Sequence, residues 1–311
     1  MSTYTLISLF AFAMSAVCGF IMIPQILSFC KKRKLYDTPD ARKIHKNAVP
    51  RLGGVSFMPS MLMATVVALL AWVYTSKGNK IGVSPWSIFF GVGITAIYIT
   101  GVIDDIFGVR ARVKLLMQIV VASLLPMSYL YINNLYGFLG IYEIPSIVGM
   151  VLTIGVLVFI MNAINLIDGI DGLSASLTLI ALSGLFFIFQ REKIWIYSIL
   201  IAGLMGVLVP FLYHNIWGKQ EKNQKIFMGD SGSLTLGYIL GVLLIKFCMY
   251  NPHVMPYQKG ATLLSVTLLL VPTFDVFRVI IVRILHRKPI FRADKNHIHH
   301  KLMRAGMTQH Q

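Results

Sequence analysis

Charged side chains are scarce in this sequence. Of its 311 residues, 13% are charged and 56% are hydrophobic, and the mean hydropathy is +0.73. A soluble domain carries about 25% charged residues. A large core cannot account for the difference, because a chain of this length still leaves most side chains near a surface. Much of that surface must therefore face lipid, which excludes an ordinary soluble domain.

Cysteine is also rare. The three cysteines, Cys18, Cys30 and Cys248, follow no ligand-like spacing. They predict neither a disulfide framework nor a cysteine metal site. Internal repeats, low-complexity stretches and long Pro/Gly/Ser linkers are absent from the sequence as well. We therefore expect residues 1–311 to form a single integral-membrane domain.

Long apolar runs fill most of the chain. About 20 apolar residues cross a bilayer as a helix. By that rule the sequence predicts an all-α transmembrane bundle of about nine spans with its N-terminus outside. The predicted spans are Tyr4–Phe29, Val55–Tyr74, Trp86–Val102, Leu115–Ile132, Ser146–Ile164, Leu173–Phe189, Ile194–Leu212, Leu234–Tyr250 and Gly260–Leu285.

The basic residues support this sidedness. Of the 28 Lys and Arg, 21 fall in the inside loops 31–52, 110–114, 219–225 and 283–304, and five fall in outside loops. Such a bias is typical of cytoplasmic loops. The net charge of +16 is thus explained by topology and an anion site. No aromatic-rich basic module indicates a nucleic-acid partner.

Acidic residues number only twelve, and the pair Asp104-Asp105 closes the third predicted span. Adjacent carboxylates repel each other, so such a pair calls for a cation or a nearby base. Simple capping of the helix end remains an alternative for this pair alone.

A second acidic segment runs from Asn162 to Gly172. Asn162, Asn165, Asp168 and Asp171 recur at every third position, so they share one face while the segment is helical. Facing lipid would be costly for these groups, so they must face protein or a wet cavity. A purely structural polar seam is the less favoured alternative.

A third acidic site is Met228-Gly-Asp-Ser-Gly-Ser233, just before the eighth span. Small residues around Asp230 suit a turn that meets a phosphate or Mg²⁺, although an ordinary helix cap has the same composition. Asp275, three residues before Arg278, is better explained as half of an internal ion pair.

Two basic clusters lie on the same predicted inside face. One runs from Arg42 through Lys46 to Arg51, and the other is His297-Ile-His-His300. Because no cysteine accompanies the histidines, phosphate binding is favoured over zinc. Carboxylates that hold Mg²⁺, together with cations that neutralise a diphosphate, are what phosphoryl transfer needs.

These motifs, from Asp37 to His300 and in this order, resemble the polyprenyl-phosphate N-acetylhexosamine-1-phosphate transferases of glycosyltransferase family 4. The forms Asp40-Ala-Arg-Lys-Ile-His45, Pro50-Arg-Leu-Gly-Gly54 and His297-Ile-His-His300 are similar to the N-acetylglucosamine branch. The muramoyl-pentapeptide branch typically shows three consecutive histidines. Members of the N-acetylglucosamine branch continue beyond this loop, so a chain ending at Gln311 is expected to be a short variant or truncated.

The resemblance implies the roles of individual residues. It implies Mg²⁺, with Mn²⁺ as an alternative, held by Asp230 and Asp105, and it implies a catalytic set of Asp104, Asp105, Asp230, His297, His299 and His300. The substrate-binding set that it implies consists of Lys46, Arg51, Lys114, Asn162, Asn165, Asp168, Asp171 and Phe227, the last stacking on uracil.

The implied reaction transfers N-acetylglucosamine 1-phosphate from a UDP-sugar to undecaprenyl phosphate and releases UMP. It would start a cell-envelope glycan at a bacterial inner membrane. A UDP-N-acetylmuramoyl-pentapeptide donor is one alternative. An ion-coupled transporter is another, but transporters place carboxylates near the midplane on repeated, broken helices, whereas these lie at inside ends.

Overall fold

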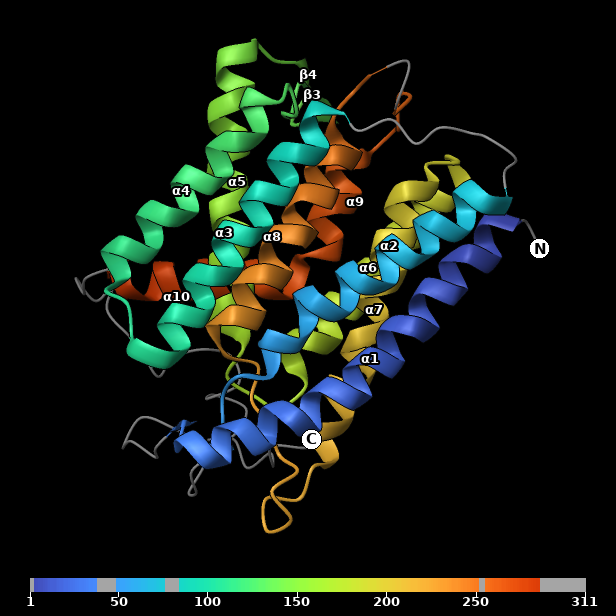
Figure 1. Cartoon of the computed structure of the whole chain (residues 1–311). Helices are drawn as coiled ribbons and strands as arrows, with labels where there is room; N and C mark the ends of the chain where they lie inside the picture. The colour runs from blue at the N-terminus through green and yellow to red at the C-terminus, as the bar shows by residue number, and fades with distance from the viewer. Residues whose placement is uncertain (1–2, 38–48, 76–83, 252–254, 286–311) are drawn as a thin grey trace.

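The computed structural model describes residues 3–37, 49–75, 84–251 and 255–285. These ranges are mainly helical, with short strands at the connections (Figure 1). The α-helices are α1 (Thr3–Arg33), α2 (Phe57–Thr75), α3 (Pro85–Phe107), α4 (Ala111–Met127), α5 (Ser146–Ile167), α6 (Leu173–Arg191), α7 (Trp195–Leu212), α8 (Gly229–Cys248), α9 (Ala261–Leu268) and α10 (Leu270–Leu285).

Short elements complete the described chain. A 3₁₀ turn η1 (Gly53–Ser56) precedes α2, and a π-helical turn η2 (Tyr213–Trp217) extends α7. Two antiparallel pairs join β1 (Tyr36–Asp37) to β2 (Val49–Pro50) and β3 (Asn134–Phe138) to β4 (Ile141–Glu143). These pairs lie at opposite ends of the bundle.

The connections gather at the two ends of the bundle (Figure 1). At the lower end lie the last turns of α1 and α3 and the segment joining α7 to α8; the β3–β4 hairpin and the start of α3 lie at the upper end. The described parts of three predicted inside loops, at the end of α1, between α3 and α4, and between α7 and α8, therefore share one end of the bundle. We call the lower end the site end.

Helix α8 forms the centre of the fold. Every residue from Ser231 to Cys248 is buried, and α8 packs most extensively against α5 and α3. Glycine permits this closeness, since a Cβ at Gly237 would lie 2.7 Å from the Cα of Met161 in α5. Small residues at such contacts are typical of helix packing in membranes.

The outer surface is apolar. Large hydrophobic side chains such as Phe20 on α1, Leu70 on α2 and Phe187 on α6 are exposed at 46%, 64% and 72%. In water such a surface would aggregate, whereas in a bilayer it is fully compatible with its solvent. The protein is therefore a multi-pass membrane protein.

The expected nine spans need correction. In the described ranges, seven helical segments are long and apolar enough to cross a membrane. The fourth predicted span is α4, whose 17 residues fall short of that length. The ninth is not one helix, because α9 ends at Leu268 and α10 turns away across the bundle (Figure 1).

Proline explains the break in the ninth predicted span. Pro272 has no amide hydrogen to bond the carbonyl of Leu268, and its ring would clash with that carbonyl. Within α10, the guanidinium of Arg278 lies 2.9 Å from the carboxylate of Asp275, which is only 1% exposed. The predicted i,i+3 ion pair is confirmed.

Candidate active site

Four helix ends bring polar side chains together at the site end. Asp104 and Asp105 lie in the last turn of α3, and Asp230 lies in the first turn of α8. Lys114 comes from the first turn of α4, and Asn165 from the last turn of α5. These residues come from segments far apart in sequence, so only the fold brings them together.

Lys114 is the cation of this cluster. Its ammonium nitrogen lies 2.6 Å from a carboxylate oxygen of Asp104 and 2.6 Å from one of Asp230. The three side chains are 19%, 10% and 27% exposed. In such partly desolvated surroundings two carboxylates repel strongly, and one shared ammonium offsets the repulsion.

Asp105 has a different environment. Its two carboxylate oxygens accept the backbone N–H groups of Asp230 and Ser231, at 2.8 and 2.9 Å. These amides belong to the first turn of α8, where N–H groups lack helical partners and the helix dipole favours a negative charge. Asp105 thus caps α8 from another helix and fixes the position of Asp230.

Arg51 stabilises the end of α3 itself. Its Nε donates to the carbonyl oxygen of Asp105 at 2.9 Å, and its Nη2 donates to the carbonyls of Asp105 and Asp104 at 2.6 and 3.4 Å. A cation at a helix C-terminus neutralises the last carbonyls. In this arrangement the guanidinium holds the backbone of the carboxylate pair, and its predicted contact with a substrate stays a prediction.

The glycine-rich segments on either side of Arg51 and Asp230 lie against each other. The amides of Gly53 and Gly54 donate to the carbonyls of Phe227 and Met228 at 2.9 and 2.8 Å. A Cβ at Gly54 would lie 2.0 Å from the amide nitrogen of Gly232. Only glycine allows this approach, and it holds half-buried Phe227 beside the first turn of α8.

The two asparagines of α5 have different hydrogen-bond partners. The Asn165 amide donates to the second carboxylate oxygen of Asp230 and to the Ser233 hydroxyl. Asn162, one turn earlier, exchanges amide hydrogen bonds with buried Gln118 of α4. The structure therefore brings Asn165 into the carboxylate cluster and places Asn162 in the seam between α4 and α5.

Beyond α5 the chain turns through Asp168 to Gly172, and this turn is fastened to the segment before α8. Asp171 and Lys225 form an ion pair at 2.6 Å, with the Asp171 side chain 6% exposed. The Asn215 amide accepts the Gly172 N–H at 2.6 Å and donates to the carbonyl of Ile226 at 2.7 Å. Two segments that carry predicted nucleotide contacts are thus fixed together.

Asp168 lies in the same turn, half-buried. Desolvation, followed by the negative charges of Asp230, Asp105 and Asp171, raises the pKa of the Asp168 carboxyl to about 8. At neutral pH and without a bound cation this group holds its proton. A carboxyl kept neutral in this way can donate a hydrogen bond.

Sequence reasoning missed several residues of this region. Lys225 was counted only as a loop charge, Asn215 lies in the π-helical turn, and Gln118 lies within an apolar run. A buried amide in a span is itself a signal, because polar groups in apolar runs usually face a partner. Four predicted site residues lie outside the described residues: Lys46, His297, His299 and His300.

The donor atoms suit a hard divalent cation. No group of three or more His, Cys, Asp or Glu side chains that could hold a metal ion occurs in the described part of the chain. Mg²⁺, however, is commonly held by one or two carboxylates with substrate phosphates and water. Asp104 and Asp230, whose oxygens share one ammonium, provide two such carboxylates. The residues present therefore fit Mg²⁺.

Fold and site together define a multi-pass membrane protein with a carboxylate–lysine centre at one end of its bundle. The sequence profile of a family described as glycosyl transferase family 4 matches residues 87–248, which run from the first turn of α3 to the end of α8. A curated relative from Bacillus subtilis is 32% identical over 96% of this chain and 78% of its own length. The chain therefore belongs to glycosyltransferase family 4.

The relatives carry consistent names. The Bacillus subtilis protein is called a probable undecaprenyl-phosphate N-acetylglucosaminyl 1-phosphate transferase. A Mycobacterium leprae protein, 31% identical over 86% of this chain and 70% of its own, is called a decaprenyl-phosphate N-acetylglucosaminephosphotransferase. A Yersinia pestis protein, 24% identical over 98% and 78%, is called an undecaprenyl-phosphate alpha-N-acetylglucosaminyl 1-phosphate transferase.

Proposed function

We propose that this protein transfers N-acetylglucosamine 1-phosphate from UDP-N-acetylglucosamine to undecaprenyl phosphate and releases UMP. The observation that carries the proposal is the centre formed by Asp104, Lys114 and Asp230 at one end of a membrane bundle. The names of the three relatives support a polyprenyl phosphate acceptor, undecaprenyl in two of them, and an N-acetylglucosamine 1-phosphate group. The product would begin a lipid-linked glycan of the cell envelope.

The reaction that suits this centre is a direct displacement. An oxygen of the lipid phosphate attacks the β-phosphorus of the UDP-sugar, and the bond to UMP breaks. Asp104 and Asp230 would hold Mg²⁺, or Mn²⁺ in its place, and the bound ion would neutralise the charge that moves onto the leaving UMP. The Lys114 ammonium lies where it can bind a phosphate oxygen once the carboxylates hold the ion.

A general base has little to do in this displacement. A phosphate monoester has a second pKa near about 6, so the acceptor is largely dianionic at neutral pH. Asp104 would then help to hold the ion and would not be needed to remove a proton. Asp105, whose two oxygens accept amides of α8, would hold Asp230 in place, and its role as a direct metal ligand stays a prediction.

The nucleotide would lie against the turn after α5. Protonated Asp168 can donate to a uracil or ribose oxygen, and Phe227 offers an aromatic face for uracil. Lys225 holds Asp171, and Asn215 holds Gly172, so this wall is rigid before substrate arrives. The predicted phosphate contacts of Lys46, His297, His299 and His300 remain part of the proposal.

The proposed location is the bacterial inner membrane, with the site end in the cytoplasm, because UDP-sugars are made there and the described basic residues 31–34, 110–114 and 219–225 lie at that end. A cysteine introduced at Ser84 and one introduced at Gln220 would test this in right-side-out vesicles. Labelling of the first alone by an impermeant maleimide is expected. Labelling of the second alone would reverse the orientation.

The reaction is tested with detergent-purified protein, undecaprenyl phosphate, Mg²⁺ and radiolabelled UDP-N-acetylglucosamine. Label should enter the lipid phase, and it should be lost with Asp230→Ala and with chelator. UDP-N-acetylmuramoyl-pentapeptide serves as the second donor. Product from that donor alone would assign the muramoyl reaction, and no lipid product from either would refute the proposal.

A further inference from the structure

A buried amide pair joins α4 to α5 one helical turn inside the site end. Gln118 of α4 is 0% exposed, and its Oε1 accepts a hydrogen bond from the Nδ2 of Asn162 on α5 at 2.7 Å. In return, the Gln118 Nε2 lies 3.5 Å from the Asn162 Oδ1. The Asn162 amide also donates to the carbonyl of Val158 at 2.8 Å. Both side chains thus use a donor and an acceptor within apolar stretches of sequence.

The amide pair is in register with two residues of the carboxylate centre. Gln118 follows Lys114 by four positions on α4. Asn162 precedes Asn165 by three positions on α5, and residues at either spacing share a helix face. Lys114 bonds one carboxylate oxygen of Asp230 at 2.6 Å, and the Asn165 amide bonds the other. The helices α4 and α5 are therefore linked twice on one face, once through Asp230 and once through the amide pair.

The first turn of α4 lies at the surface of the bundle. Residues 111–113 are exposed, and Gln118 is the first residue of the described helix that is buried. Lys114 is held by its own ion pairs with the two aspartates, which are the groups that the proposed reaction engages. The position of the Lys114 backbone therefore depends on how α4 is fastened one turn later.

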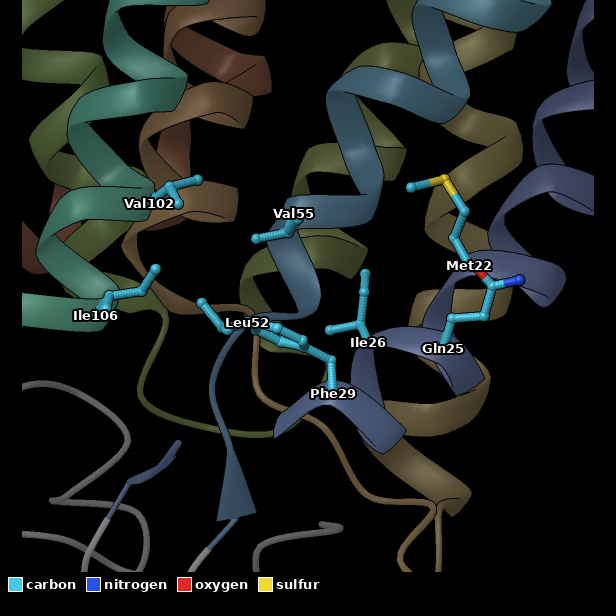
Figure 2. A pocket seen from close by; sticks show the side chains of 8 residues that line it. All are labelled: Met22, Gln25, Ile26, Phe29, Leu52, Val55, Val102 and Ile106. Carbon is cyan, nitrogen blue, oxygen red and sulfur yellow. The ribbon is translucent and has the colours of Figure 1, made fainter. Parts of the chain in front are cut away.

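The other neighbour of this part of α4 is α3. In the described ranges its polar side-chain contact with α4 is the Asp104–Lys114 ion pair itself. On α3, Val102 and Ile106 line a mainly apolar cleft shared with α1 (Figure 2). Apolar contacts are not directional, whereas a hydrogen bond between two amides is. A directional contact that can fix the rotation of α4 about its axis is therefore found on the α5 side.

We infer that Gln118 is a positioning residue for the transfer reaction. Through its bonds to Asn162 it fixes the rotation of α4 and so directs Lys114 at Asp230 and at the phosphate oxygen that Lys114 would bind. The inference rests on the proposed function and adds a residue that acts through another side chain. It makes Asn162 the partner of Gln118 in the helix seam and not a direct contact of the nucleotide.

The amide pair stays in place while the centre rearranges. In the proposed reaction the Lys114 ammonium exchanges a carboxylate oxygen for a phosphate oxygen. Its side chain is a flexible four-carbon stem, so the place that the ammonium reaches depends on the backbone of α4. A displacement of about 1 Å in an active site can lower the rate about a hundredfold. Interhelical hydrogen bonds contribute little to the stability of membrane proteins, so the main effect of the pair is on geometry.

The first test removes the hydrogen bonds and keeps a side chain of similar size. Gln118→Leu should lower kcat by about tenfold in the radiolabelled-lipid assay, while the KM of each substrate stays within about twofold. The matched control is Gln190→Leu, because Gln190 of α6 bonds Thr5 and Ser8 of α1, at 3.3 Å each, at the opposite end of the bundle. It should leave kcat unchanged. An unchanged kcat in folded Gln118→Leu enzyme, or an equal loss in both variants, would overturn the inference.

The second test asks whether Asn162 acts through Gln118. Asn162→Leu should lower kcat to the same extent as Gln118→Leu, and the double variant should be no slower than either single variant, within about twofold. Losses that multiply in the double variant would show an independent role for Asn162. A KM for UDP-N-acetylglucosamine raised about tenfold by Asn162→Leu alone would show a direct nucleotide contact. Either result overturns the inference.

An exchanged pair keeps the inference testable if the leucine variants do not fold. Gln118→Asn alone shortens the reach of the amide and should lower kcat. Adding Asn162→Gln restores the combined length of the two side chains, and it should recover most of the lost kcat. A double variant as slow as Gln118→Asn alone, or slower, would overturn the inference. Thermal unfolding in detergent shows which variants are folded.

The two proposals fail in distinguishable ways. Wild-type enzyme that makes lipid product, with Gln118 variants that turn over equally fast, refutes the positioning role alone. Wild-type enzyme that makes no lipid product from either donor refutes the proposed function.

Discussion

The two ends of α8 carry opposite charges in different surroundings. At its first turn, Asp230 is bonded by Lys114, Asn165 and, through its own amide, Asp105. At its last turn, Lys246 is 4% exposed and lies 5.8 Å from the ring centres of Trp86 and Tyr197. At a rise of 1.5 Å per residue these charges are about 24 Å apart.

The surroundings of these two charges distinguish a cluster of interacting polar groups from a charge that is held mainly by packing. Burying a network of carboxylates, amides and an ammonium costs desolvation free energy for every group. Such a network stabilises the fold only when each group has its hydrogen-bond or ion-pair partner. A lysine beside a stacked pair of aromatic rings has only weak attractions to them, and its largely apolar side chain packs well. We therefore expect substitutions at the site end to reduce activity and stability together, and the substitution at the far end to do neither.

The largest effect is expected from Lys114→Met. Removing the ammonium leaves Asp104 and Asp230 facing each other, which should destabilise the protein by about 3 kcal/mol and reduce turnover by about a hundredfold or more. Thermal unfolding in detergent and the radiolabelled-lipid assay measure these changes. The double variant Lys114→Met with Asp104→Asn should regain stability but not activity. Full activity in the single variant would contradict the assigned centre.

A smaller effect is expected from changing the cap of α8. Asp105→Ala removes the acceptor of two amides and should cost about 1–2 kcal/mol. Asp105→Asn keeps one acceptor oxygen and should be milder. If Asp105 acts through Asp230, the Asp105→Asn enzyme keeps part of the wild-type turnover and still requires Mg²⁺. The Asp230→Asn enzyme should keep neither property. Equal inactivity of the two Asn variants, with equal loss of Mg²⁺ affinity, would make Asp105 a direct ligand.

The pH dependence of stability should report on Asp168. Its carboxyl has a pKa of about 8 in the folded protein, against about 3.9 when unfolded. The folded state thus binds this proton more tightly, so the stabilisation is complete below about pH 4 and is lost as the pH rises through 8. By about pH 9 the loss passes about 1 kcal/mol relative to pH 7. In chelator, Asp168→Asn should flatten the fall in unfolding temperature between pH 7 and 9; an identical fall in both proteins would contradict the assignment.

The smallest effect is expected from Lys246→Met. The methionine fills similar space beside the stacked rings of Trp86 and Tyr197 and avoids burying an ammonium, so stability should stay within about 1 kcal/mol of wild type or rise. Activity should be unchanged. A loss of more than about 2 kcal/mol would show that the two aromatic faces hold the charge as firmly as the carboxylates hold Lys114.

Much of this arrangement was predictable from sequence. Apolar runs located most of the helices, and the basic residues correctly grouped the described connections after α1, α3 and α7 at one end, because both depend on local composition. The break at Pro272 was missed, since the apolar run continues on both sides of it and hides the lost hydrogen bond. Which side of the membrane the site end occupies stays a prediction.

The sequence predicted which residues belong to the site better than it predicted the contacts that each of them makes. Scarce acids at span ends identified Asp104, Asp105 and Asp230. Spacing could not show that Asp105 binds amides of α8 while its neighbour binds Lys114, because that depends on how the ends of α3 and α8 meet. Asn162 and Asn165 share a face, yet one meets Gln118 and the other Asp230. Such distinctions arise from tertiary packing.

The complete burial of α8 has a consequence for how the protein is made. Among the seven long apolar segments α8 has the lowest mean hydropathy, 1.6, and its most apolar window is wholly enclosed by other helices. In the folded protein α8 is thus surrounded by the other helices and not by lipid. Asp230 meets Asp105 across 125 positions of chain, so until α8 has been synthesised Asp105 lacks the two backbone amides that it binds in the finished protein. The carboxylate–lysine centre is therefore complete only after α8 has been synthesised and has packed among the helices that precede it.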